Sequence, residues 1–171
     1  AYNTIMEMVQ AASEKGLELL GINDHAPEMP GGPHLFYFNN LKIMPREING
    51  MPVLFGTEVN IMDYDGKLDL PKSTLKQMDV VIASLHTPGI KPGSVQENTK
   101  ALVAALKNPY VNIIGHPDDG RYPVDMEQIV ATAKEEHKLL ELNNHSLDPS
   151  GTRVGAEEND ILMLKYCMEY Q

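Results

Sequence analysis

Three histidines and one glutamate stand directly after apolar segments of the chain, and their side chains are of the types that bind metal ions. These residues are His25, Glu58, His86 and His116. Imidazole nitrogens and carboxylate oxygens are ligands for zinc and similar divalent metals, and a carboxylate can also bridge two ions. Each residue alone is better explained as the polar end of a buried segment. Their repetition at four equivalent places predicts a metal site, because imidazoles are costly to bring together without a shared ligand.

Five further polar residues are placed where they could support such a site or contact a substrate. They are Asp24, Asn60, Asn143, His145 and Arg121. We expect Asp24 to orient His25 rather than to bind metal itself, although it could also cap a following helix. Asn60 is a candidate contact for a substrate or a water, or a turn residue, and Arg121 is a candidate phosphate contact or a solvated charge. Asn143 and His145 either form a turn or reach the site.

The apolar segments have the length of buried strands, and the segments between them have helical periodicity. Strands are predicted over residues 17–23, 52–57, 79–85, 111–115 and 139–143. Helices are predicted over residues 4–15, 94–107, 125–137 and 157–170, with Asn3 capping the first, with short helices in 34–46 and 71–78, and with a small hairpin over 62–70. This alternation is typical of a parallel sheet in an α/β fold. The candidate residues would then lie together at the carboxyl edge of the sheet, where such folds place their active sites.

Length and composition limit the classes of function. The 171 residues, 42% of them hydrophobic, fit one folded domain. The net charge of −10 argues against nucleic acids and anionic membranes as partners, because such binding needs clustered Lys and Arg. With one cysteine, Cys167, no disulfide can form within this sequence, and no apolar run reaches the ~18 residues of a membrane span, so we expect a cytoplasmic protein. Glycine-rich phosphate loops and the serine nucleophile elbow are absent from the sequence.

Four short motifs resemble those of the polymerase and histidinol phosphatase (PHP) family, and most closely its YcdX-like phosphatase branch. The motifs are Ile22-Asn23-Asp24-His25, Gly56-Thr57-Glu58-Val59-Asn60, Ser84-Leu85-His86 and Gly115-His116-Pro117. The resemblance implies a distorted (β/α)7 barrel with up to three metal ions, usually zinc or manganese, with iron as a further candidate. It implies that Glu58 bridges two ions, that His86 and His116 hold one of them, and that His25 helps to hold the third.

Two features of the PHP pattern do not occur in this sequence. The family opens with a His-x-His pair on its first strand and closes with an Asp-x-His pair on its last strand. We therefore expect residues 1–171 to form a single PHP-type domain that is incomplete at both ends and lacks the first and last strands. The alternative is a degenerate, non-catalytic protein.

The motifs and the resemblance together predict a metal-dependent hydrolase of phosphate esters. A metal-activated hydroxide would attack phosphorus, with Glu58, His86 and His116 at the centre of a multinuclear site. The expected substrate is a small phosphorylated molecule, selected by the loops over residues 26–33 and 62–70. A PHP-type nuclease or proofreading module and a metal-binding protein without turnover are the alternatives. Unpaired strand edges are also compatible with a homo-oligomer.

Overall fold

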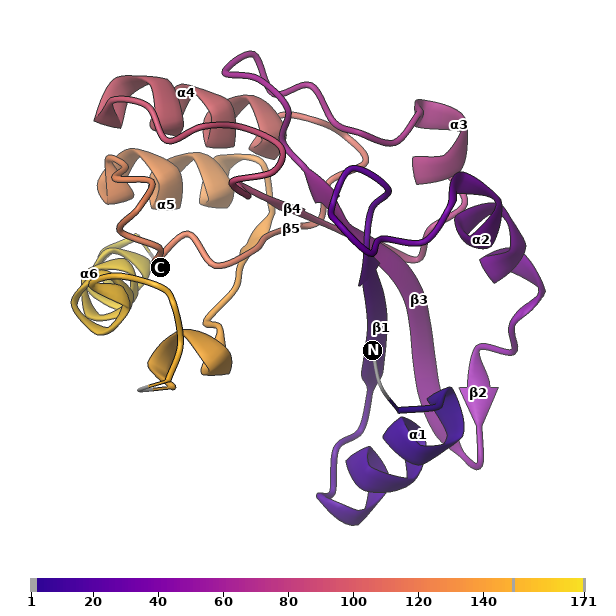
Figure 1. Ribbon diagram of the computed structural model, residues 1–171. Helices are drawn as coiled ribbons and strands as arrows, with labels where there is room; N and C mark the ends of the chain where they lie inside the picture. The colour runs from indigo at the N-terminus through magenta and orange to yellow at the C-terminus, as the bar shows by residue number, and fades with distance from the viewer. Residues whose placement is uncertain (1–2, 149, 171) are drawn as a thin grey trace.

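A parallel sheet forms the centre of the computed structural model, which describes residues 3–148 and 150–170 (Figure 1). Its strands are β1 (Leu20–His25), β3 (Met51–Asn60), β4 (Val80–Ser84), β5 (Ile113–Ile114) and β6 (Leu139–Leu140), in the order β1-β3-β4-β5-β6. The short strand β2 (Glu47–Ile48) pairs antiparallel with β3 and makes the sheet six-stranded. The predicted α/β fold with a parallel sheet is confirmed.

The ten-residue strand β3 is the main element of the core. It pairs with β1 on one side and with β4 on the other, and side chains on both of its faces are buried. Val53, Phe55 and Val59 are fully buried there. A parallel strand covered on both faces needs a nearly continuous apolar sequence, which is what residues 51–59 provide.

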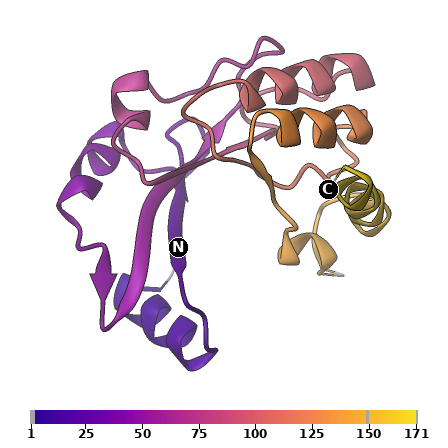
Figure 2. The same ribbon diagram turned by 180° about the vertical axis from the view of Figure 1, so that it is seen from behind.

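Helices α1 (Ile5–Glu14), α4 (Val95–Leu106), α5 (Met126–Glu135) and α6 (Ala156–Glu169) are the longer helices of the described chain. The short helical segments are α2 (Leu35–Asn40), η1 (Leu41–Ile43), α3 (Lys72–Leu75) and η2 (Asn144–Leu147). Helices α4 and α5 lie side by side, and α6 packs against α5 (Figures 1 and 2). Capping boxes at Thr4 and Ser94 fix the starts of α1 and α4, because each side chain accepts a hydrogen bond from a free backbone N–H of the first turn.

The first strand differs from its prediction. Residues 17–19 do not belong to β1, which begins at Leu20 and extends through Asp24 and His25. Gly16 ends α1 with φ of +73°, and the N–H of Leu17 donates to the carbonyl of Ala12, so this segment completes the helix end. The cap of α1 is Thr4 rather than the predicted Asn3, because the Thr4 hydroxyl accepts from the N–H of Glu7.

The small hairpin predicted over residues 62–70 is present: an antiparallel bridge joins Ile61 and Leu68, and the N–H groups of Met62 and Asp69 donate to the carbonyls of Lys67 and Asn60. The Asp63 carboxylate accepts the N–H groups of Asp65 and Lys67 in its turn. Two further predictions were wrong in extent. The strand predicted over 139–143 is limited to Leu139–Leu140. The prediction of five strands missed β2, which is two residues long and too short to show a period.

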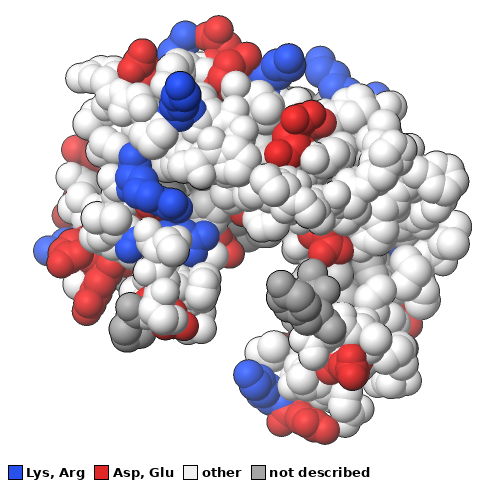
Figure 3. Space-filling view, in the orientation of Figure 1, with Lys and Arg blue, Asp and Glu red and all other residues white. Residues whose placement is uncertain are grey.

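The described sheet is open. Strands β1 and β6 are the two ends of the strand order and do not pair with each other. The molecule is hollowed between the part that carries α1 and the part that carries α6 (Figure 3). None of the helices in the described chain is both long and apolar enough to cross a membrane.

Candidate metal centre

The strand register brings His25 and Glu58 together. His25 is the last residue of β1 and lies directly opposite Glu58 of β3. His86 follows β4 by two residues, and His116 follows β5 by two residues. Because these parallel strands all end at the same edge, four residues that are far apart in the sequence, between positions 25 and 116, meet at one place.

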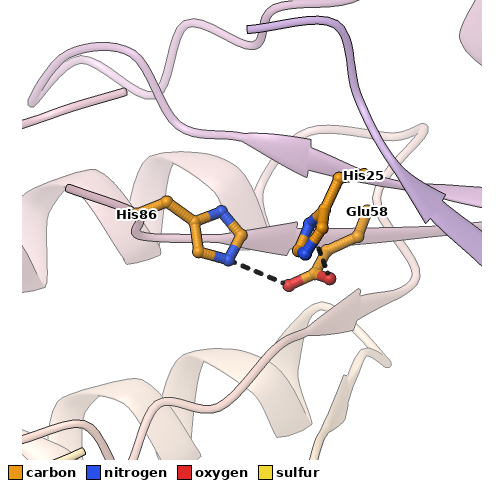
Figure 4. Close-up of side chains that lie close together, drawn as sticks. All are labelled: His25, Glu58 and His86. Atoms are coloured by element: carbon orange, nitrogen blue, oxygen red, sulfur yellow. Dashed lines mark ion pairs between the residues drawn. The ribbon is translucent and has the colours of Figure 1, made fainter. Parts of the chain in front are cut away.

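The four side chains make short contacts. Oε2 of Glu58 lies 3.1 Å from Nδ1 of His25, and its Oε1 lies 3.2 Å from Nε2 of both His86 and His116. The two Nε2 atoms of His86 and His116 are 3.1 Å apart. Figure 4 shows His25, Glu58 and His86 converging, and one ligand atom from each of these three lies within 4.8 Å of the others.

Burial differs among the four side chains. His116 is 4% exposed, His86 11%, Glu58 18% and His25 45%. The cluster therefore has a buried side formed by His86 and His116 and an open side at His25. A ligand could reach the cluster from the His25 side.

The local charges favour an ionised Glu58 and a neutral His86. Burial alone would raise the pKa of Glu58, but its contacts with His116 and His86 and the hydroxyl of Ser84 outweigh burial and lower the pKa below its ordinary range. Burial lowers the pKa of His86, and the opposing effect of Glu58 is insufficient to reverse this. The cluster thus offers a carboxylate and neutral imidazole, which are the protonation states that metal ligands need.

The geometry of the donor atoms fits a divalent cation. Ligand bonds of ~2.0–2.1 Å in a tetrahedral site place the ligand atoms ~3.3 Å from one another. The three distances among Oε1 of Glu58 and the Nε2 atoms of His86 and His116 are 3.1–3.2 Å. Lone pairs that face one another at this distance need a proton or a cation between them, and a single cation would satisfy all three atoms.

Asn60 supports His86 from behind. Its Oδ1 lies 2.8 Å from Nδ1 of His86, while its Nδ2 donates to Oδ2 of Asp69 at 2.7 Å. Asn60 is fully buried. The structure therefore places Asn60 next to a candidate ligand, away from any solvent-facing position where it could meet a substrate.

His116 is held in an unusual backbone conformation. Its φ of 33° is in the left-handed region, which costs free energy for a residue other than glycine. The N–H of His116 donates to Oε2 of Glu141 at 2.8 Å. The preceding residue, Gly115, has no room for a Cβ, because a Cβ there would overlap the Ser84 hydroxyl. That hydroxyl donates a hydrogen bond to Oε1 of Glu58 at 2.7 Å.

The remaining predicted residues lie around the cluster or outside it. Asp24 accepts a hydrogen bond from the hydroxyl of Tyr37 at 2.5 Å, and its predicted effect on His25 stays a prediction. The Nδ2 of Asn143 donates to Oε2 of Glu141, the same oxygen that accepts from His116, so Asn143 connects to the cluster through Glu141.

Arg121 and His145 contact groups outside the cluster. Arg121 binds Asp119 through Nε and Nη2, at distances of 2.6–3.0 Å, and Asp119 is 2% exposed. His145 is 73% exposed, and its nearest ionic contact is Asp148 at 4.0 Å. The structure does not bring either residue into the group of ligand atoms described above.

Sequence reasoning missed three residues that support the ligands: Ser84, Asp69 and Glu141. Ser84 could have been found, because it is the last residue of β4 and lies at the same edge of the sheet as the other strand-end residues. Asp69 gave no signal, since it reaches the cluster only through the tertiary fold. Glu141 directly follows β6 at that edge, so the strand-end pattern could have indicated it.

Comparison with known proteins identifies close relatives in bacteria. The chain is 46% identical over 170 residues to a probable phosphatase of Clostridium novyi (strain NT), covering 99% of this chain and 69% of that protein. It is 50% identical over 170 residues to a probable phosphatase of Thermoanaerobacter sp. (strain X514), with the same coverage. A probable phosphatase of Caldanaerobacter subterraneus is 52% identical over 159 residues, which are 92% of this chain and 62% of that protein. No family model matches the sequence.

One solved structure shares the fold. A chain in the cryo-EM structure of archaeal ribonuclease P with mature tRNA superimposes with a TM-score of 0.55 over 98% of this chain and 67% of that chain. The two sequences are 14% identical, so the likeness concerns the fold alone.

Proposed function

Since the chain belongs to the family of these bacterial probable phosphatases, we propose that it hydrolyses phosphate esters of small molecules with the help of divalent metal ions. The observation that carries this proposal is the meeting of Glu58, His86 and His116 through ligand atoms 3.1–3.2 Å apart. The acidic net charge of −10 makes a bound cation useful for attracting an anionic phosphate.

Each residue of the cluster has a defined task in this proposal. His86, His116 and Oε1 of Glu58 would hold one cation, and Oε2 of Glu58 together with His25 would hold part of a second site. A divalent cation at such a position lowers the pKa of a coordinated water and neutralises charge on a phosphate. Ser84 keeps Oε1 of Glu58 in place through its 2.7 Å hydrogen bond, and Glu141 holds the backbone of His116.

The finer parts of the proposal rest on the resemblance to the PHP family. A site with up to three zinc, manganese or iron ions, and a distorted (β/α)7 barrel, would need ligands and strands beyond those described. The relatives are longer than this chain, which spans 69% of the first two cited above. We propose that the additional residues of a protein as long as these relatives pair with the free edges of β1 and β6.

Hydrolysis of 4-nitrophenyl phosphate tests this function. We expect turnover that is lost with a chelator, restored by zinc or manganese, and reduced at least 100-fold in Glu58→Gln, which keeps the shape but removes the charge. Glu135→Gln is the matched control, because Glu135 is exposed on α5 and should leave turnover unchanged. Equal turnover with and without chelator would refute metal dependence, and bound metal without turnover would support the non-catalytic alternative.

A further inference from the structure

A partly buried row of polar groups runs from Asp69 through Asn60 to His86. Oδ1 of Asp69 accepts the backbone N–H of Asn60 at 2.8 Å, and its Oδ2 accepts Nδ2 of Asn60 at 2.7 Å. The other end of the Asn60 amide, Oδ1, lies 2.8 Å from Nδ1 of His86. Asn60 is fully buried, so its amide has no access to water.

The direction of every hydrogen bond in this row follows from the Asp69 carboxylate. An ionised carboxylate can only accept, so the amide of Asn60 must turn its NH2 group towards Asp69. The carbonyl oxygen of Asn60 then faces His86 and can only accept as well. Nδ1 of His86 must therefore carry the proton that is donated to Asn60. In a neutral imidazole this leaves Nε2 with a free lone pair, directed at Glu58 and His116.

We propose that Asp69 is a positioning residue that sets the tautomer of His86 and thereby keeps its Nε2 available as a metal ligand. The metal-binding part of this inference rests on the proposed function, whereas the tautomer part stands on the hydrogen bonds alone. Asp69 touches neither the ligand atoms nor a substrate, and it acts on the cluster only through the amide of Asn60.

Asp69 also connects the cluster to a loop at the rim of the site. The backbone N–H of Glu28, in the loop over residues 26–33, donates to Oδ2 of Asp69 at 3.2 Å. The same oxygen thus accepts one hydrogen bond from the loop and one from Asn60. A movement of this loop would remove one of the hydrogen bonds that fix the Asp69 carboxylate in place, so the loop and the orientation of His86 are physically linked.

Substitution of Asp69→Asn tests the proposal without changing the shape of the side chain. The new amide has one acceptor oxygen where the carboxylate has two, so it cannot serve the backbone N–H and the side chain of Asn60 together. The amide of Asn60 is no longer held in one orientation and can turn its NH2 group towards His86. Nδ1 of His86 would then accept, and its proton would move to Nε2.

The double substitution Asn60→Asp and Asp69→Asn is the rescue variant. A carboxylate at position 60 accepts from Nδ1 of His86, and the amide at position 69 can donate to that carboxylate. The direction of the hydrogen bond between positions 60 and 69 is reversed, but His86 again carries its proton on Nδ1. A structural defect at position 69 would persist in the double variant, whereas a tautomer effect would be repaired.

Asp63→Asn is the matched control. Asp63 lies in the same segment as Asp69, and its carboxylate also accepts backbone N–H groups, from Asp65 and Lys67. Within the described chain, Asp63 makes no hydrogen bond to Asn60 or His86. The control therefore makes the same carboxylate-to-amide change in the same segment without a hydrogen-bonded path to the metal cluster.

Long-range proton–nitrogen NMR spectra of histidine-labelled, metal-free protein at pH 8 would read the tautomer directly. We expect Nδ1–H for His86 in the wild type, in Asp63→Asn and in the double variant, and an appreciable Nε2–H population in Asp69→Asn. Zinc affinity, measured by competition with a chromogenic chelator, should fall about 10- to 100-fold in Asp69→Asn. It should return to within several-fold of the wild type in the double variant.

The proposal is overturned if His86 stays entirely in the Nδ1–H form in Asp69→Asn, or if the double variant shows the same defect as the single one. These results are separate from the test of phosphatase activity. A wild-type protein without turnover would refute the proposed function but leave the tautomer measurement in metal-free protein fully informative.

Discussion

Replacing Asp160 with asparagine should stabilise the fold near neutral pH. Asp160 lies in α6 and is 4% exposed, and within the described chain neither of its carboxylate oxygens has a hydrogen-bond partner. Asp118 is fully buried, and within the described chain both of its carboxylate oxygens also have no hydrogen-bond partner. Burial raises the pKa of Asp160 to about 6, the negative charge of Asp118 adds to this, and Arg153 opposes it.

The size of the effect follows from that pKa. The ordinary pKa of an aspartate is 3.8, and that of Asp160 is about 6. Each unit corresponds to ~1.4 kcal/mol, so the ionised side chain lowers the free energy of unfolding by about 3 kcal/mol. The folded protein holds the proton more tightly than the unfolded chain does. The stabilisation that the bound proton gives to the folded state is therefore complete below pH ~4 and is lost as the pH rises through 6.

Urea unfolding of the wild type and of Asp160→Asn between pH 4 and pH 8 measures this difference. We expect the variant to be more stable by about 3 kcal/mol at pH 8 and indistinguishable at pH 4, because an amide resembles the protonated acid. Asp125→Asn is the control, since Asp125 is an exposed N-cap and asparagine caps equally well. A variant that is less stable than the wild type at pH 8, or a difference that does not change with pH, would refute the reasoning.

Two further changes probe the residues around the metal cluster. Gly115→Ala should lower the free energy of unfolding by about 1–3 kcal/mol, because the new Cβ overlaps the Ser84 hydroxyl, and urea unfolding should show part of the loss recovered when Ser84→Ala is added. Asp119→Asn should cost about 1.5–3 kcal/mol at pH 7 through weaker hydrogen bonds from Arg121. Burial would raise the pKa of Asp119, but Arg121 outweighs burial and lowers this pKa. The loss of stability in Asp119→Asn should therefore become smaller when unfolding is measured at lower pH. A loss that stays constant with pH would contradict this prediction.

The order of elements was readable from the sequence because local patterns carry it. The helical periodicity over residues 94–107 and the apolar segment over residues 52–57 are signals within a few residues of one another. The limits of the short strands were not readable, since β5 and β6 have two residues each and their extent depends on pairing with neighbours. The exposed segment at residues 17–19 was assigned to a strand because two of its residues are apolar. The hydrogen bond from the N–H of Leu17 to the carbonyl of Ala12, which makes this segment part of the helix end, is not visible in the sequence.

The sequence by itself determined which side chains could bind a metal and that parallel strands would bring them to one edge. His25, Glu58, His86 and His116 follow apolar segments, and that pattern is visible without coordinates. Only the tertiary structure decided how these ligands are supported. The hydrogen bonds of Asp69 to Asn60 and of His116 to Glu141 depend on loops and on a positive φ that no local pattern specifies. Distances of 3.1–3.2 Å between the candidate ligand atoms arise from packing of the whole sheet, which is why the sequence could name the candidate ligands but not their arrangement.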